Sequence, residues 1–417
     1  MSTNRPISGG SRRNFVRSTA GFLAAAPLFA WPAQTPDKSH GGPALAYVGT
    51  YSSPQGPEGS KGRGKGIYLF EMNRSTGALS QRALFENDSN PSWLALNSSR
   101  THLYSGNETD TYKGASSGSV SAYSIERSSG RLTLLNTVAS GGAGPAYISV
   151  HPSGKYVLSA NYAGGTVAVL PIRANGEVGD ATDVKHDHGP VGSLHAASAP
   201  PGSFAISGHD KPHAHTIESD PSGRFVISTD LGMDRILVWK FDSERGKLMP
   251  NDPAFVPVPP GDGPRHIVFH PNKRWFYSLQ EEGSTLIAFD YDSATGKLTA
   301  KQTISTLPKG FTGTSFTSEV RISSDGRFLY AGNRLHDTIA FFSIDAADGK
   351  LAFVGEEWTR GDYPRSFTID PTGNFLYSCN QRSDAVTTFR VNRQTGRLTF
   401  TGQYTPVGTP AIVVFLS

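Results

Sequence analysis

Polar side chains recur at two fixed positions of a repeated pattern whose other strand-like positions are mostly apolar. The first column of residues lies six positions before a turn-forming anchor in each repeat and comprises Ser92, Ala146, His215, Arg265, Ser318 and Arg365. The second column lies nine and ten positions after the anchor and comprises Asn107-Glu108, Asn161-Tyr162, Asp230-Leu231, Gln280-Glu281, Asn333-Arg334 and Asn380-Gln381. Glutamate and histidine can act as general acids or bases, and arginine can hold a carboxylate, a phosphate or an oxyanion. The two columns are therefore candidates for a catalytic, anion-binding site.

These residue types also have structural explanations. Polar side chains at strand ends cap turns and bridge neighbouring sheets, and an Arg265–Glu281 pair could be purely structural. Six of the twelve histidines fall close together, at His186, His188, His195, His209, His213 and His215. A His-x-His pair can share a metal, but no cysteine or fixed ligand spacing accompanies it. We therefore favour a polar loop with one functional histidine, and we expect no metal and no cofactor. Cys379, the only cysteine, excludes an internal disulfide and is expected to be a small buried residue.

Two kinds of turn define the elements that must position the columns. In seven places an apolar alternating run is followed by a polar residue and a glycine, at Thr76-Gly77, Ser129-Gly130, Asn175-Gly176, Arg245-Gly246, Thr295-Gly296, Asp348-Gly349 and Thr395-Gly396. Glycine supplies the positive φ that a hairpin turn needs, so we place these turns between the third and fourth strands of a repeated unit. A second turn, between the first and second strands, occurs six times and supplies the anchors Ser98, Pro152, Pro221, Pro271, Ser324 and Pro371.

The mismatch between seven and six turns predicts how the chain closes. Residues 45–50 align with second strands, and residues 410–415 align with first strands. We therefore predict an all-β, seven-bladed β-propeller in which the N- and C-terminal strands pair in one blade, which removes the open sheet edge. The turn tally disfavours six or eight blades. Most anchors are about 50 residues apart, a kelch-like period, and the longer interval between Pro152 and Pro221 indicates an insertion at about 180–211, which we expect to be a loop.

The columns should meet at one mouth of the central channel. The first strand of each propeller blade lines the channel, and the second strand runs antiparallel beside it. The start of each first strand and the end of each second strand therefore lie on the same face, where polar residues from several blades converge around a ligand.

The N-terminal segment resembles an export signal. Arg12 and Arg13 match the twin-arginine pattern, and an apolar run follows from Ala20 to about Ala33, too short to span a bilayer. We predict a signal peptide at residues 1–33, a linker at 34–43 and the propeller at 44–417. The signal accounts for the formal charge of +4, so the mature chain is neutral and gives no indication of nucleic-acid binding. We expect a periplasmic monomer that is not attached to a membrane after cleavage.

Several ungapped motifs resemble the lactonase propellers of the 6-phosphogluconolactonase and carboxymuconate cycloisomerase type. They are Pro212-His213-Ala214-His215, Asp230-Leu231-Gly232-Met233-Asp234, Gly263-Pro264-Arg265-His266, Ser318-Glu319-Val320-Arg321 and Asn380-Gln381, in order along the whole mature chain. In the muconate-lactonising relatives one histidine, one glutamate and two arginines are implicated in catalysis and anion binding. The resemblance implies that His215, Glu281, Arg265 and Arg334 take these roles here.

The implied chemistry is hydrolysis of a sugar lactone. A base must deprotonate the attacking water, and positive charge must hold the oxyanion. Either Glu281 or His215 could be the base, with the other protonating the leaving hydroxyl. The residues expected to bind substrate are His213, Asp230, Ser318, Glu319, Arg365 and Gln381. Export favours a non-phosphorylated lactone over 6-phosphogluconolactone, and the alternatives are a muconate-type cycloisomerase and a non-catalytic periplasmic binding module.

Overall fold

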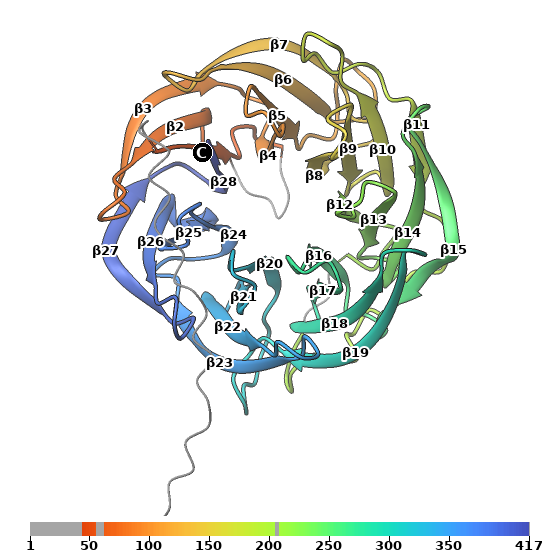
Figure 1. Ribbon diagram of the computed structural model, residues 1–417, viewed down its shortest axis with the longest axis vertical. Helices are drawn as coiled ribbons and strands as arrows, with labels where there is room; N and C mark the ends of the chain where they lie inside the picture. Colours follow the sequence, from red (N-terminus) through yellow and green to blue (C-terminus); the bar gives the residue numbers. More distant parts are fainter. Residues whose placement is uncertain (1–43, 56–61, 205–207, 417) are drawn as a thin grey trace, which may run out of the picture. The chain divides into compact units, whose positions relative to one another are not determined.

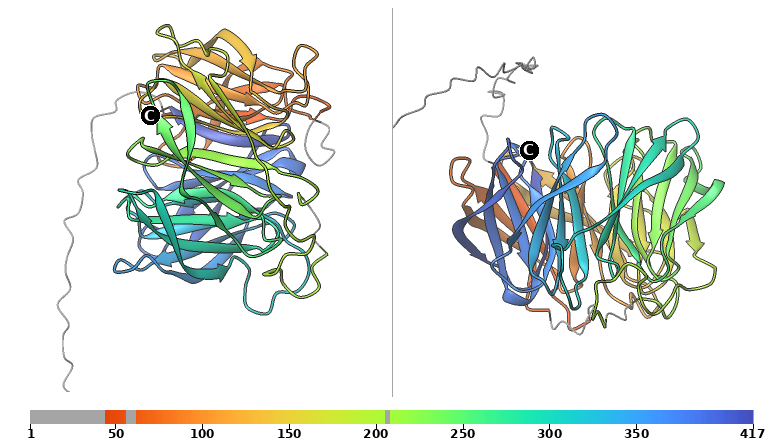
Figure 2. Two further views of the ribbon diagram at one scale, coloured as in Figure 1. Left: turned by 90° about the vertical axis from the view of Figure 1, so that its right-hand side faces the viewer. Right: turned by 90° about the horizontal axis from the view of Figure 1, so that it is seen from below.

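The computed structural model describes residues 44–55, 62–204 and 208–416. In these ranges the chain forms seven four-stranded antiparallel sheets, the blades, which surround a central channel (Figure 1). Figure 2 shows the blades from the side, with their strands running between the two faces of the ring. The predicted signal peptide and linker lie outside the described residues. None of the helical segments among the described residues is long and apolar enough to span a membrane.

Blades 1 to 4 follow one another around the channel. Blade 1 contains β28 (Pro410–Leu416), β1 (Ala44–Thr50), β2 (Gly66–Met72) and β3 (Leu79–Glu86). Blade 2 contains β4 (Pro91–Leu96), β5 (His102–Asn107), β6 (Ser119–Glu126) and β7 (Arg131–Ala139). Blade 3 contains β8 (Pro145–Val150), β9 (Tyr156–Asn161), β10 (Thr166–Pro171) and β11 (Asp183–His186). Blade 4 contains β12 (Ala214–Ser219), β13 (Phe225–Asp230), β14 (Arg235–Asp242) and β15 (Lys247–Pro257).

Blades 5 to 7 complete the ring. Blade 5 contains β16 (Pro264–Phe269), β17 (Trp275–Gln280), β18 (Thr285–Asp292) and β19 (Lys297–Ser305). Blade 6 contains β20 (Thr317–Ile322), β21 (Phe328–Asn333), β22 (Thr338–Ile344) and β23 (Leu351–Trp358). Blade 7 contains β24 (Pro364–Ile369), β25 (Phe375–Asn380), β26 (Ala385–Val391) and β27 (Leu398–Pro406), with the short 3-10 helix η2 (Gln381–Ser383) after β25.

The closure of the ring confirms the prediction from the turn tally. Strand β1 pairs antiparallel with β28, in a register that places Tyr47 opposite Val414 and Val48 opposite Val413. All seven residues of β1 are buried, because both faces of this blade pack against neighbouring blades. The seven-bladed β-propeller predicted from the repeats is thus the observed fold.

The two turn types also lie where the repeats placed them. The seven glycine turns join the third and fourth strands, and the glycines have φ between 63° and 89°, a region that a side chain disfavours. The insertion differs in one respect from the expected loop. Residues Asp183–His186 form β11, the outer strand of blade 3, and pair with β10. This strand is only four residues long, too short to show an alternating pattern against the surrounding polar residues.

Tyrosines of the second strands link neighbouring blades. Their hydroxyls donate to backbone carbonyls in the glycine turns of the next blade: Tyr47 to Gly130, Tyr104 to Gly176, Tyr277 to Gly349, Tyr330 to Gly396 and Tyr377 to Gly77, over 2.7–3.2 Å. The last of these bonds spans from blade 7 to blade 1, across the closure. Each of these five rings is fully buried, so the bonds are made away from solvent.

We predict that Tyr377→Phe destabilises the fold while leaving its shape unchanged. The substitution leaves the Gly77 carbonyl without its buried donor, which costs about 1–3 kcal/mol. Urea unfolding measures the loss, and Tyr404→Phe, at a side chain that is 54% exposed, serves as the control. Equal stability of the Tyr377 and Tyr404 variants would show that the blade-to-blade bond contributes nothing at the closure.

Candidate active site

The two polar columns converge on one face of the ring. Each member of the first column is the second residue of a first strand, and each pair of the second column ends a second strand and begins the loop that follows it. Antiparallel pairing places these positions side by side, for example Pro264 opposite Gln280 and Thr317 opposite Asn333. The register shifts at this end of every first strand. Such bulges change the direction in which side chains point. Here they lie at the mouth of the channel.

Two buried arginines share one carboxylate at this mouth. Glu281 Oε2 lies 2.7 Å from Arg265 Nε, and Glu281 Oε1 lies 2.7 Å from Arg334 Nη2. Arg334 also donates to the Thr317 carbonyl at 3.0 Å and to the Tyr363 hydroxyl at 3.1 Å. The side chains of the three charged residues are at most 9% exposed. Blades 5 and 6 therefore hold two guanidinium groups in fixed positions around a common counter-charge.

The electrostatics of this cluster favour its ionised form. Burial alone would raise the pKa of Glu281, but the Arg334 and Arg265 guanidiniums outweigh it and lower this pKa below its ordinary value. Burial, with Arg334 and Arg365 close by, lowers the pKa of Arg265 to about 10. Arg265 thus remains protonated at neutral pH. A carboxylate held by two guanidiniums is a weak base, because its negative charge is already stabilised.

His215 is a neutral imidazole beside this cluster. It is 4% exposed, and its ring lies edge-on to that of His266, with centroids 5.1 Å apart. Burial, and then the positive charge of Arg265, lower the pKa of His215 well below its ordinary value. Its Nδ1 is buried and has no hydrogen-bond partner among the described residues. An uncharged imidazole with an unused ring nitrogen can accept or donate a proton at a ligand.

A second charged pair lies across the mouth, on blades 7 and 2. Arg365 Nη2 is 3.7 Å from Glu108 Oε1. The other Glu108 oxygen accepts hydrogen bonds from Ser92 at 2.6 Å and from Tyr51 at 2.8 Å. Sequence reasoning placed Glu108 in the second column without giving it a role. It missed Tyr51, because blade 1 is built from both chain ends and has no anchor turn from which to count. Burial raises the pKa of Glu108, and Arg365 and the two hydroxyls oppose this shift. The mouth thus has three buried guanidiniums, each next to a carboxyl group.

His213 and Asp230 are occupied by local contacts. The His213 ring stacks on Tyr162 at 4.2 Å, and its Nε2 lies 2.7 Å from Asp210 Oδ1. Asp230 accepts from the backbone N–H groups of His213 and Met233, at 3.0 and 2.9 Å. The Tyr162 ring also packs edge-on against His215, with centroids 5.5 Å apart, so the two imidazoles of the His-x-His motif share this neighbour. Among the described residues, no three histidine, cysteine or acidic side chains form a group that could hold a metal.

The long insertion is tied to this face by buried acids. Burial, and then the neighbouring Asp230 carboxylate, raise the pKa of Asp187 well above its ordinary value, which favours the protonated form of this side chain. Further along the insertion, His209 Nε2 lies 3.1 Å from Asp234 Oδ1. Asp234 also accepts from the Gly263 N–H at 3.0 Å, two residues before Arg265. The insertion is thus anchored to the backbone that positions the catalytic candidates.

The remaining predicted residues divide into two groups. The hydroxyl of Ser318 and the amide of Gln381 are buried and have no hydrogen-bond partner among the described residues. They are unsatisfied polar groups at this end of the channel. Glu319 is only 2% exposed, and its oxygens contact His266, the Val320 N–H and Arg321. Its carboxylate is already used within the protein.

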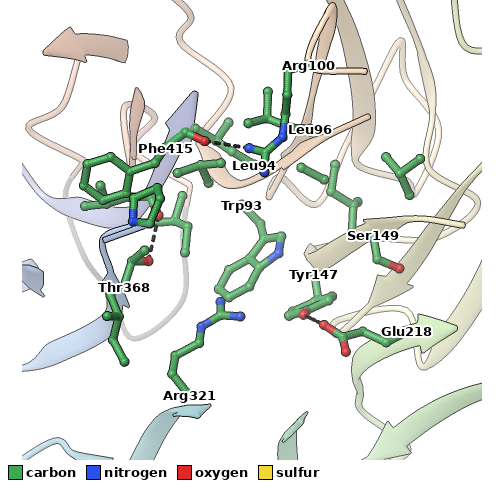
Figure 3. Close-up of a pocket in the computed structure, with 18 of the residues that line it drawn as sticks. Trp93, Leu94, Leu96, Arg100, Tyr147, Ser149, Glu218, Arg321, Thr368 and Phe415 are labelled. Carbon is green, nitrogen blue, oxygen red and sulfur yellow. Dashed lines mark hydrogen bonds between the residues drawn. The ribbon is translucent and has the colours of Figure 1, made fainter. Parts of the chain in front are cut away.

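A pocket of about 480 Å³ opens at the other end of the channel (Figure 3). It is lined by later residues of the first strands, among them Leu96, Val150 and Ile369, whereas the polar columns lie at the beginning of these strands. Trp93 and Tyr147, whose rings are 4.4 Å apart, also line it. The predicted site residues do not contribute to this pocket, so the two ends of the channel differ in chemistry.

Comparison with known proteins identifies the family. The family model described as "Lactonase, 7-bladed beta-propeller" matches residues 45–415. The chain belongs to the seven-bladed β-propeller lactonases. A 6-phosphogluconolactonase of Bacillus subtilis (strain 168) is 35% identical over 327 residues, which cover 78% of this chain and 85% of that protein. A 6-phosphogluconolactonase of Formosa agariphila is 30% identical over 313 residues, covering 74% and 83%.

A solved structure shows the same architecture in another member of this type. The periplasmic gluconolactonase of Pseudomonas aeruginosa matches with a TM-score of 0.80 at 31% sequence identity, covering 90% of this chain and 99% of that chain. The resemblance to lactonase propellers inferred from motifs is therefore confirmed for the family and for the fold.

We predict that His215 remains neutral throughout the physiological range in this lactonase. Because burial and nearby guanidiniums disfavour the imidazolium, its apparent pKa should lie well below 6.5. A histidine ring-proton NMR titration measures this value, with the signal assigned by its loss in His215→Gln. An apparent pKa of 6.5 or higher would contradict the electrostatic description of the mouth.

Proposed function

We propose that the protein hydrolyses a sugar lactone at the mouth lined by the two columns. The observation that carries the proposal is the placement of neutral His215 beside two guanidiniums that Glu281 holds in place. Lactone hydrolysis needs a proton acceptor for water and fixed positive charge for the oxyanion. The names of the relatives, 6-phosphogluconolactonase and gluconolactonase, support a sugar-derived lactone.

The residue environments favour different roles for the two candidate bases. His215 is neutral and accepts a proton from the attacking water, then returns it to the ring oxygen as the ester bond breaks. Arg265 and Arg334 stabilise the negative charge that develops on the carbonyl oxygen. Glu281, weakened as a base by its two ion pairs, holds both guanidiniums in position. The hydroxyl groups of the sugar are contacted by Ser318, Gln381 and Arg365. His213 and Asp230 form part of the wall of the substrate site.

The substrate that we favour is an unphosphorylated sugar lactone. Each of the three arginines at the mouth already contacts a carboxyl group, which leaves little free positive charge for a dianionic phosphate. Export to the periplasm would also separate the protein from cytosolic sugar phosphates. The structurally similar gluconolactonase of Pseudomonas aeruginosa is a periplasmic protein.

We predict that Glu281→Gln lowers kcat for gluconolactone by about 10²-fold, the cost of catalytic groups misplaced by about 1 Å. The amide keeps the size of the side chain but removes the charge shared by Arg265 and Arg334. Acid release followed by pH-stat or NMR gives the rate above spontaneous hydrolysis. Glu356→Gln is the matched control, because Glu356 lies on the outer strand β23, where its carboxylate is 3.1 Å from His336 Nε2. Full activity of Glu281→Gln would show that the Glu281 charge has no role in catalysis.

Export by the twin-arginine route is part of this proposal. Arg12 and Arg13 precede an apolar run in a segment that lies outside the described residues. We predict that replacing both arginines by lysine leaves the protein in the cytoplasm. A receptor reads the arginine pair itself, so two lysines of the same charge do not replace it. Cell fractionation measures the distribution, and Arg5→Lys serves as the control. Undiminished periplasmic yield of the double variant would exclude this route.

A further inference from the structure

His266 and Glu319 form a buried hydrogen-bonded chain that ends on Arg265. Arg265 Nη1 lies 3.1 Å from His266 Nε2, and His266 Nδ1 lies 3.1 Å from Glu319 Oε1. All three side chains are at most 2% exposed. Arg265 also donates to the Ser318 carbonyl. We propose that His266 and Glu319 are a positioning pair that fixes the orientation of the Arg265 guanidinium for the oxyanion, which rests on the proposed function.

The donor and acceptor roles in this chain have one consistent assignment. A guanidinium can only donate, so His266 Nε2 must accept from Arg265. The ring proton of neutral His266 therefore sits on Nδ1 and is donated to Glu319. Glu319 Oε1 also accepts from the Val320 N–H at 3.0 Å, so this oxygen acts only as an acceptor. Reversing the tautomer would place two N–H groups against each other at Arg265.

The surroundings of His266 hold its ring in this orientation. Trp93, Tyr147 and His215 pack edge-on against it, with centroids 5.1, 5.3 and 5.1 Å away. Burial, and then the charge of Arg265, lower the pKa of His266 well below its ordinary value, which keeps Nε2 available as an acceptor. These contacts hold the plane of the ring, and the hydrogen bonds to Arg265 and Glu319 select which nitrogen faces the arginine.

The chain continues to the pocket at the other end of the channel. Arg321 Nη2 lies 3.4 Å from Glu319 Oε2, and Figure 3 shows the Arg321 side chain directed into that pocket. Glu319 is thereby held between a histidine on the active-site side and an arginine on the far side. This arrangement assigns Glu319 a different role from the substrate contact predicted from sequence: it acts through His266 and Arg265.

A double-mutant cycle tests the proposal. His266→Phe keeps a ring in the same space but removes the acceptor for Arg265. We expect kcat/KM for gluconolactone to fall by about 10²-fold, as for a catalytic group displaced by about 1 Å. In an Arg265→Gln background the same substitution should have no further effect, because His266 acts through that arginine. If the two substitutions instead reduced kcat/KM by independent factors that multiply in the double variant, the proposal would be overturned.

Variants of Glu319 and a matched histidine complete the test. Glu319→Gln keeps an oxygen that can accept from His266, whereas Glu319→Leu does not, so the leucine variant should lose more activity. His270→Phe is the control, because His270 directly follows β16 and its contacts, with the Gly326 carbonyl at 2.8 Å, the Asn272 N–H at 3.1 Å and the ring of Trp275, lie away from Arg265. Its kcat/KM should be unchanged. Equal activity of Glu319→Leu and the parent would contradict the positioning role.

Nitrogen-15 NMR of His266 separates this inference from the proposed function. The protein without substrate should show the ring proton on Nδ1, and His266→Phe identifies the signal. A proton on Nε2 would overturn the positioning pair whatever the activity of the parent. If the tautomer is Nδ1–H and the parent hydrolyses no lactone, the proposed reaction is wrong, while the hydrogen-bonded chain to Arg265 stands.

Discussion

Two arginines that share one buried carboxylate are the interaction on which the candidate active site depends. Burying a guanidinium without a partner is costly, and removing one partner of a buried ion pair destabilises a protein by about 3–5 kcal/mol. Glu281 is the charged partner of both Arg265 and Arg334, with a contact of 2.7 Å to each. Burial, and then the positive charge of these arginines, keep His215 and His266 neutral. The ionised carboxylate, the fixed cations and the uncharged imidazoles therefore follow from the same cluster.

The propeller makes this cluster possible by bringing distant segments together. Arg265 and Glu281 come from adjacent strands of blade 5, and Arg334 comes from blade 6. The second strands are buried on both faces and leave little freedom for their ends to move. Tyrosine hydroxyls bonded to the next blade fix the blades relative to one another. Closure of the ring through β1 and β28 removes the free edges that would otherwise let the first blade open.

Sequence reasoning predicted the fold and the convergence of the two polar columns because both follow from a repeat. Turn glycines and anchors give the strand order, and counting from the anchors placed Arg265, Glu281 and Arg334 together. Counting could not find Tyr51, whose blade has no anchor. It also missed His266, since a regular strand places consecutive side chains on opposite faces. The irregular pairing between Pro264 and Ile267 allows Arg265 and His266 to contact each other, and such a bulge has no distinct signal in this sequence.

A crystal structure with bound gluconate, the acid formed from gluconolactone, tests the central claim most directly. The account predicts that the gluconate carboxylate lies within about 2.7–3.2 Å of a guanidinium nitrogen of Arg265 or Arg334. It also predicts that the His215 ring lies close enough to exchange a proton with the bound acid. Gluconate bound only in the pocket at the other end of the channel, or at the mouth with its carboxylate turned away from both arginines, would contradict the account.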